Sequence, residues 1–184
     1  MLNRRGSSPL ERYDRTTITL HWLIAAGVVG QWLGAHAIDW FPKGPLRVDA
    51  RSVHIVIGTL LVLAFSYRVF WRRTSGMRFA IAEPLIRDRV ASLVHLSLYV
   101  LLGAVLVLGL LNSWVRGDDI FGQFHLPKYG NLTPDDRHAL SGQVVRLHRL
   151  AANALLVLAG VHAAAGFYHF AVLRDRVLQR MLPL

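Results

Sequence analysis

Hydrophobic residues along the chain gather into four long runs, and the charged and turn-forming residues collect between them. None of the four runs contains Asp or Glu. A helix needs about 20 mostly apolar residues to cross the hydrocarbon core of a bilayer, which is about 30 Å thick. The pattern therefore predicts four transmembrane helices, over residues 17–38, 52–71, 90–114 and 145–173.

These helices predict an all-α integral membrane protein, a four-helix bundle that forms one domain over residues 1–184. The first run follows a polar start with four arginines and precedes no clear small-residue cleavage site. It is therefore expected to remain as a helix and not to act as a cleaved signal peptide. The connection between the third and fourth runs holds Gly122, Pro127, Gly130 and Pro134, and is expected to be an exposed loop of about 30 residues.

Basic residues are distributed unevenly between the two sides that four spans create. Thirteen lie on the side of the two termini and eight lie on the opposite side. Cytoplasmic segments of membrane proteins carry the excess of Lys and Arg, so both termini are predicted to be cytoplasmic.

Composition agrees with a membrane location and excludes several kinds of chemistry. Of the 184 residues, 53% are apolar and 17% are charged, against roughly a quarter charged in typical soluble proteins. The formal charge of +10 does not predict a nucleic-acid partner, because the basic residues flank the apolar runs. Without cysteine the chain has no disulfide, no thiolate metal site and no covalently attached haem.

Four of the nine histidines fall into a pattern of depth across the predicted membrane. His148 and His162 are fourteen residues apart in the fourth run. This spacing gives about 21 Å of helical rise and places both on nearly the same helix face. His21 begins the first run at the depth of His162, and His54 begins the second run at the depth of His148. The sequence thus predicts an inner pair, His21 with His162, and an outer pair, His54 with His148.

Two facing imidazoles are the ligands that a bis-histidine haem iron requires. A zinc or non-haem iron site needs three or more converging ligands, and no third ligand is evident at either depth. The four histidines are therefore the candidate iron ligands of two haems. A single histidine inside a membrane can also serve only as a hydrogen-bond partner between helices, and that alternative stays open for each one taken alone.

Small and basic residues near the histidines suit a porphyrin. Gly58 lies four residues after His54, and Arg68 lies fourteen residues after His54, at the predicted depth of the inner pair. An ionisable residue inside a span is a functional candidate, and Arg68 is a natural partner for a haem propionate. Two alternatives remain: Arg68 can extend to the interface, and Gly58 can serve helix packing.

Two further histidines compete for these roles. His169 lies only seven residues after His162, but about 31 Å of rise from His148 would put it at the water interface, so His162 is the preferred ligand. His95, early in the third run, is predicted to have no histidine partner, and a quinone contact, a propionate contact and a simple interfacial position all stay open for it. His36 lies at a span end and is expected to be solvated.

Several segments carry a resemblance that covers nearly the whole chain: Tyr13-Asp14-Arg15 before His21-Trp22, His54 with Gly58, Arg68 to Arg72, His95 with Tyr99, His148-Arg149-Leu150-Ala151, and His162 through His169 to Arg180-Met181-Leu182-Pro183. In these segments the chain resembles the bacterial cytochrome b561 family of four-helix, two-haem membrane proteins. One departure concerns the third helix, where relatives often carry a proline shortly before the glycine that matches Gly109.

The resemblance implies axial ligands at His21, His54, His148 and His162, two non-covalent b-type haems and ubiquinone as a substrate. The candidate cofactor-binding residues are then Gly58, Arg68, His95 and Arg149. Some stand-alone members look like superoxide oxidases that reduce ubiquinone, whereas others are cytochrome b subunits that take electrons from a dehydrogenase partner. The implied location is the bacterial inner membrane, in contact with lipid.

Basic residues on the predicted outer side are candidates for attracting superoxide, a small anion. They are Lys43, Arg47, Arg51 and Lys128. The same charges also suit lipid phosphate or an acidic protein partner, and no residue is assigned a catalytic role. A transporter that uses histidine for a metal or a proton is the remote alternative, because transport pathways usually contain carboxylates inside the membrane and these runs have none.

Overall fold

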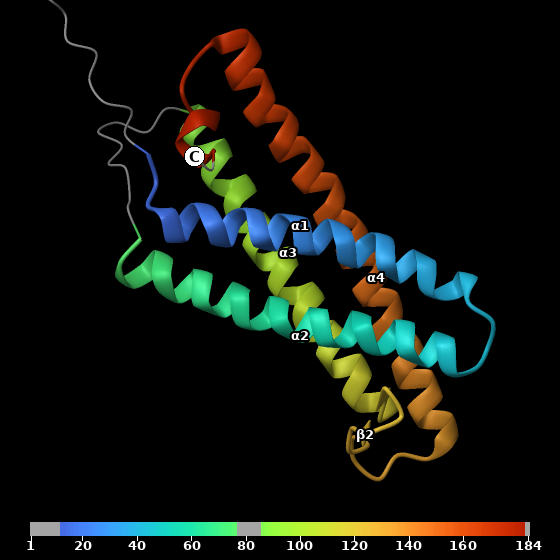
Figure 1. Cartoon of the computed structure of the whole chain (residues 1–184). Coiled ribbons are helices and arrows are strands. Elements are labelled where there is room, and N and C mark those ends of the chain that lie inside the picture. Colours follow the sequence, from blue (N-terminus) through green and yellow to red (C-terminus); the bar gives the residue numbers. More distant parts are fainter. Residues whose placement is uncertain (1–11, 77–85, 183–184) are drawn as a thin grey trace, which may run out of the picture.

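Four long helices make up most of the protein (Figure 1), and the fold predicted from the hydrophobic runs is confirmed. The structure is a computed structural model that describes residues 12–76 and 86–182. Each long helix is long and apolar enough to cross a membrane. The four are α1 (Arg15–Ala37), α2 (Pro45–Thr74), α3 (Ile86–Arg116) and α4 (Pro134–Tyr168). Arg4, Arg5, Arg78 and Pro183, which enter the charge count or the resemblance, lie outside the described residues.

Short elements join or extend these helices. A 3₁₀ turn, η1 (Ile38–Trp40), follows α1, and a small antiparallel hairpin, β1 (Asp119–Ile120) with β2 (Phe124–His125), lies between α3 and α4. After α4 come a π-helical turn, η2 (His169–Leu173), and a final 3₁₀ turn, η3 (Leu178–Met181).

Two helices begin well before the positions predicted from hydrophobicity, at Pro45 rather than residue 52 and at Pro134 rather than residue 145. The hydrophobic runs mark where a helix enters apolar surroundings, but capping decides where it starts. Thr133 caps α4 because its hydroxyl oxygen accepts a hydrogen bond from the Asp136 N–H at 3.2 Å, and proline follows at the first helical position. The predicted exposed loop of about 30 residues is therefore wrong: it shrinks to residues 117–133 and contains the hairpin.

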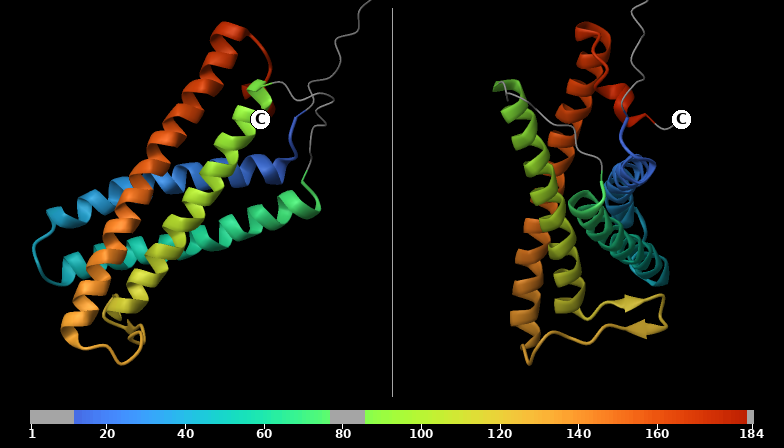
Figure 2. Two further views of the ribbon diagram at one scale, coloured as in Figure 1. Left: turned by 180° about the vertical axis from the view of Figure 1, so that it is seen from behind. Right: turned by 90° about the vertical axis from the view of Figure 1, so that its left-hand side faces the viewer.

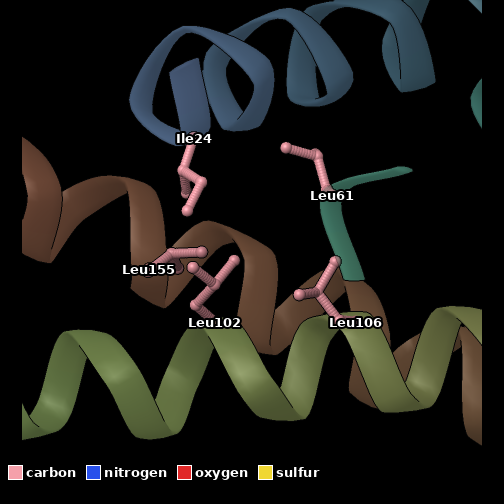
Figure 3. Close-up of a cluster of buried hydrophobic side chains, with 5 residues drawn as sticks. All are labelled: Ile24, Leu61, Leu102, Leu106 and Leu155. Atoms are coloured by element: carbon pink, nitrogen blue, oxygen red, sulfur yellow. The ribbon is translucent and has the colours of Figure 1, made fainter. Parts of the chain in front are cut away.

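The helices are arranged as two antiparallel pairs that cross (Figures 1 and 2). The pair α1–α2 lies across the pair α3–α4. A cluster of buried side chains fills the crossing, with every helix contributing (Figure 3). Its members are Ile24, Leu61, Leu102, Leu106 and Leu155.

Most large apolar side chains outside this cluster are exposed, which is the distribution expected of helices surrounded by lipid. Leu63 is 63% exposed and Val157 is 69% exposed, although both lie well inside their helices. In water such a surface would drive aggregation, whereas in a bilayer it contacts acyl chains. The fold and the surface together describe a membrane-embedded bundle.

Hydrogen bonds tie the two ends of the bundle. At the end that carries the termini, Asp14 accepts from the backbone N–H of Thr17 and from the indole N–H of Trp71, both at 2.8 Å. At the opposite end, the buried hydroxyl of Ser52 on α2 donates to the Asp119 carbonyl at 3.2 Å and accepts from the Phe121 N–H at 3.0 Å. These contacts fix the helix ends, and therefore fix the depths at which the histidines lie.

Candidate functional site

The histidines that were paired by depth face each other in space. In the inner pair, the ring centroids of His21 and His162 are 6.3 Å apart, and in the outer pair those of His54 and His148 are 6.4 Å apart. The interplanar angles are 78° and 81°. The inner pair joins α1 to α4, and the outer pair joins α2 to α4, so α4 contributes one histidine to each pair.

The near-identical separation of the two pairs matches the distance expected for two imidazoles that bind one metal atom. A metal held between two imidazoles makes two bonds to nitrogen of about 2.0 Å each, and adding the distance from each nitrogen to its ring centre gives roughly 6.3 Å between centroids. Rings in edge-to-face contact can have a similar separation, so it is the combination of two imidazoles at this distance in both pairs that suits a metal. Both pairs thus have the separation needed to hold one metal atom between them, as two axial ligands of a haem do.

The outer pair is oriented by groups around it. The Nδ1–H of His148 donates to the Val105 carbonyl at 2.9 Å, which leaves Nε2 free to bind a metal. His54 has a buried Nδ1 without a hydrogen-bond partner among the described residues. Its backbone carbonyl accepts from the Gln31 side-chain amide at 2.7 Å, and Gly58 lies beside that amide, at a position where a β-carbon would be in van der Waals contact with the Gln31 nitrogen at 3.4 Å.

Gly109 on α3 leaves the space in which the His148 ring lies. A β-carbon at this position would be 3.1 Å from Cε1 of His148. We expect Gly109→Ala to displace the ring and weaken the outer site by about 1–3 kcal/mol, the usual cost of overpacking. The control is Gly103→Ala on the same helix, where a β-carbon meets Phe65 at an ordinary 3.7 Å. Haem content and thermal unfolding of both variants measure the difference, and equal loss in both would contradict the role of Gly109.

A third histidine belongs to the inner site, and the prediction that His95 has no histidine partner is wrong. The ring centroid of His95 lies 5.1 Å from that of His162. This separation is too short to place a metal between the two rings in the manner of the two pairs. The sequence places His95 near the start of its span, but spacing within one helix does not show which neighbouring helix its ring faces.

Arg68 lies at the depth of the inner pair, as its spacing from His54 predicts. Its Nε–H donates to the Tyr99 hydroxyl at 3.1 Å, and its NH1 donates to the Thr17 carbonyl at 2.8 Å. Arg68 is thus half-buried, and its guanidinium lies between α1, α2 and α3. It is held by neutral oxygens, so its charge is available to an anionic group.

His169 forms an ion-paired contact of its own. It lies in the π-helical turn η2, and its Nδ1 is 2.5 Å from a carboxylate oxygen of Asp175. Burial raises the pKa of Asp175, but the hydrogen bonds from His169 and from the Val177 N–H together outweigh this effect and leave the pKa below its usual range. This geometry gives His169 a partner outside the two pairs.

A basic cavity of about 710 Å³ opens at the end of the bundle that carries the outer pair. Ser141 and Val145 line it from the face of α4 that also carries His148, since they lie seven and three residues before that histidine along the helix. Of the four predicted outer cations, only Lys128 lines the cavity. Its full lining is Arg116, Lys128, Leu132, Pro134, Arg137, His138, Ser141, Gly142 and Val145.

The other predicted cations are engaged elsewhere. Arg47 donates to the carbonyls of Asp39 and Phe41, and Arg51 lies 3.7 Å from the carboxylate of Asp118. Burial raises the pKa of Asp118, while the guanidinium groups of Arg116 and Arg51 counteract part of the rise. Sequence reasoning missed Arg116, Arg137 and His138 as cavity residues, because the last two were assigned to a loop and not to the first turns of α4.

The remaining candidate, Arg149, follows His148 on α4 and is exposed. Within residues 12–76 and 86–182, no group of three or more His, Cys, Asp or Glu side chains is placed to hold a metal ion. In the described part of the chain, metal-ligand geometry is therefore found in pairs of histidines.

Apolar helices that hold two facing histidine pairs at different depths are typical of membrane-bound b-type cytochromes. The model of the prokaryotic cytochrome b561 family matches residues 12–184. The chain is 28% identical to cytochrome b561 homolog 1 of Escherichia coli K12, covering 95% of this chain and 98% of the relative, and 31% identical to homolog 2, covering 94% and 92%. It is 22% identical to a probable superoxide oxidase CybB of Yersinia pestis, covering 94% and 97%.

The chain therefore belongs to the prokaryotic cytochrome b561 family. Members of this family bind b-type haem and transfer electrons, so the protein is a haem b electron-transfer protein of a bacterial membrane.

Proposed function

We propose that this cytochrome binds two b-type haems, oxidises superoxide at its outer face and reduces ubiquinone in the membrane. The observation that carries the proposal is the equal separation of the two histidine pairs, 6.3 Å and 6.4 Å between ring centroids. Each superoxide loses one electron and becomes O₂, and two such electrons with two protons convert ubiquinone into ubiquinol.

The four paired histidines are the proposed axial ligands, with His148 oriented by the Val105 carbonyl. Haem bound between two imidazoles supplies one-electron transfer and has no open coordination position for substrate. Arg68 binds a propionate at the inner site, and Gly58 lets Gln31 hold the backbone of His54. His95 lines the inner site beside His162, within reach of a propionate or of a quinone in the inner half of the bilayer.

The basic cavity is the proposed entry point for superoxide. Three cations line it, Arg116, Lys128 and Arg137, of which Arg116 is partly neutralised because it lies 3.0 Å from the carboxylate of Asp118. Ser141 and Val145 connect the cavity to the face of α4 that carries His148. A positive cavity raises the local concentration of a small anion and so raises its rate of encounter. The name of the Yersinia relative, a probable superoxide oxidase, supports the same donor.

We further propose that the protein lies in the inner membrane with both termini cytoplasmic. The excess of basic residues on the side of the termini supports this orientation. It places the basic cavity on the periplasmic side. A cytochrome b subunit that takes electrons from a dehydrogenase would instead use that cavity to dock an acidic partner.

The test is to mix the purified, haem-loaded protein rapidly with superoxide and follow the reduced haem bands, then add ubiquinone and follow their loss. We expect fast reduction that superoxide dismutase abolishes, and reoxidation that depends on the quinone concentration. A protein that shows no haem bands refutes the two-haem proposal. Haem bands that superoxide leaves oxidised, but that a dehydrogenase partner reduces, would support the partner-subunit alternative.

A further inference from the structure

One polar cluster lies away from both histidine pairs and joins α1 to α4. The indole N–H of Trp32 donates to the side-chain oxygen of Asn153 at 2.9 Å. The His36 ring lies against the indole, with centroids 4.2 Å apart, and its Nδ1 is 2.8 Å from the Trp32 carbonyl. His36 is therefore in contact with Trp32. The sequence predicted a solvated side chain and did not predict this contact.

With a neutral His36 ring, the donors and acceptors in this cluster have only one consistent arrangement. An indole N–H can only donate, so the amide oxygen of Asn153 must face it and the amide nitrogen must point away. A carbonyl can only accept, so Nδ1 of His36 must carry the proton and Nε2 of the neutral ring holds a lone pair. The cluster thus offers two N–H donors from Asn153 and one acceptor from His36 beside the indole.

The cluster is on the membrane side of α4 and not on the haem-ligand side. Asn153 is five residues after His148, which turns it roughly 140° around the helix and moves it about 7.5 Å along the axis. It shares its side of the helix with Val157, which is 69% exposed, and Asn153 is itself exposed. Beyond the crossing at Ile24 and Leu155, α1 and α4 diverge (Figures 1 and 2).

The side-chain N–H groups of Asn153 have no hydrogen-bond acceptor among the described residues, and they face the apolar part of the bilayer. Among the described residues nothing accepts a hydrogen bond from its side-chain nitrogen, and lipid acyl chains offer no acceptor. An amide donor without a partner in an apolar medium raises the free energy of the folded protein. A membrane-soluble ligand that carries an acceptor oxygen would remove this cost.

We propose that Trp32, His36 and Asn153 form a binding site for the ring of a membrane quinone, on the outer half of the bundle and separate from the inner pair. A ring oxygen accepts a hydrogen bond from the Asn153 amide, the flat ring lies against the indole, and a quinol hydroxyl donates to Nε2 of His36. The site lies close to the outer pair, because Gln31, next to Trp32, binds the His54 carbonyl at 2.7 Å.

A quinone fits this cluster better than a phospholipid ester does. Both have carbonyl acceptors near the interface, but the ester has neither a flat ring for the indole nor a hydroxyl for His36. The identity of the ligand rests on the proposed function, which names ubiquinone as the electron acceptor. The site itself rests on the hydrogen-bond geometry of the cluster.

The experiment is photolabelling of the haem-loaded protein in phospholipid vesicles with a short-chain azidoubiquinone, followed by mapping of the labelled peptides. We expect saturable label on α1 and α4 around Trp32 and Asn153, displaced by unlabelled ubiquinone. Asn153→Leu should reduce the affinity about fivefold, the loss of one hydrogen bond. Val157→Leu, one turn further along the same side of α4, is the control and should label normally.

The haem spectrum of each variant shows whether it is folded, so a drop in labelling is not confused with unfolding. Labelling that excess phospholipid displaces would overturn the site. So would labelling of α1 and α4 that is as strong in Asn153→Leu as in the unmodified protein. If superoxide-driven quinone reduction persists without label at this cluster, the site is wrong and the proposed function stands. Specific label without any quinone reduction would support the site and contradict the proposed function.

Discussion

Replacing His148 by alanine should abolish the outer haem signal and keep the inner one, whereas His162→Ala should do the reverse. Each variant leaves one imidazole where low-spin ligation needs two, so the affected pair cannot hold its haem. The haem-to-protein ratio should fall by about half in each variant, because α4 contributes one histidine to each pair. Low-temperature reduced-minus-oxidised spectra would show which component is lost.

His169→Ala is the matched control for this experiment. It removes a histidine only seven residues from His162, but one that contacts Asp175 in the structure. Both spectral components should therefore persist. Loss of the same component in His148→Ala and His162→Ala would contradict the assignment by depth, and loss of a haem in His169→Ala with none in His162→Ala would show that the wrong histidine was chosen.

The pairing of the histidines was predictable because helix geometry and membrane thickness constrain it together. A residue's depth follows from its distance to the span end, and its face follows from a period of 3.6 residues per turn. These two coordinates suffice to relate His21 to His162 and His54 to His148 without any contact information. The same arithmetic placed Arg68 beside the inner pair.

Features that depend on contacts between helices were not predictable in this way. His95 approaches His162 from α3, and no spacing within α3 indicates which neighbour its ring meets. Gly109 has a role only because the His148 ring crosses to it from α4. The basic cavity was missed in part because residues 134–144 are mostly polar, so the hydrophobic pattern began the helix too late and left Arg137 and His138 in a loop.

The basic residues on the outer side also show that sequence alone does not predict contacts. Sequence places Lys43, Arg47, Arg51 and Lys128 on one side of the membrane, but cannot distinguish a charge that faces a cavity from one that is neutralised locally. In the structure Arg47 donates to backbone carbonyls away from the cavity and Arg51 lies 3.7 Å from the carboxylate of Asp118, whereas Lys128 lines the cavity. The steering of an anion should therefore depend on these residues unequally.

Reduction of the protein by superoxide should slow when Lys128 is replaced by glutamine and change little when Lys43 is. One unit charge at about 8 Å in water changes the interaction with a monovalent anion by about 0.5 kcal/mol, which is roughly a twofold change in rate. Both variants should keep their haem bands. Stopped-flow mixing with superoxide, at constant ionic strength, measures the two rates against the unmodified protein.

Salt provides the second half of this test, because it acts on every cavity charge at once. The Debye length falls from about 30 Å at 0.01 M to about 10 Å at 0.1 M, so steering by Arg116, Lys128 and Arg137 should weaken across this range and the rate should fall with it. The fall should be smaller in Lys128→Gln than in Lys43→Gln, because the former has less charge in the cavity to screen.

A slow rate that does not change with salt in the unmodified protein would mean that superoxide is not steered to this cavity. The cavity charges would then fit the docking of an acidic dehydrogenase partner, whose own reduction of the haem should be strongly salt-dependent.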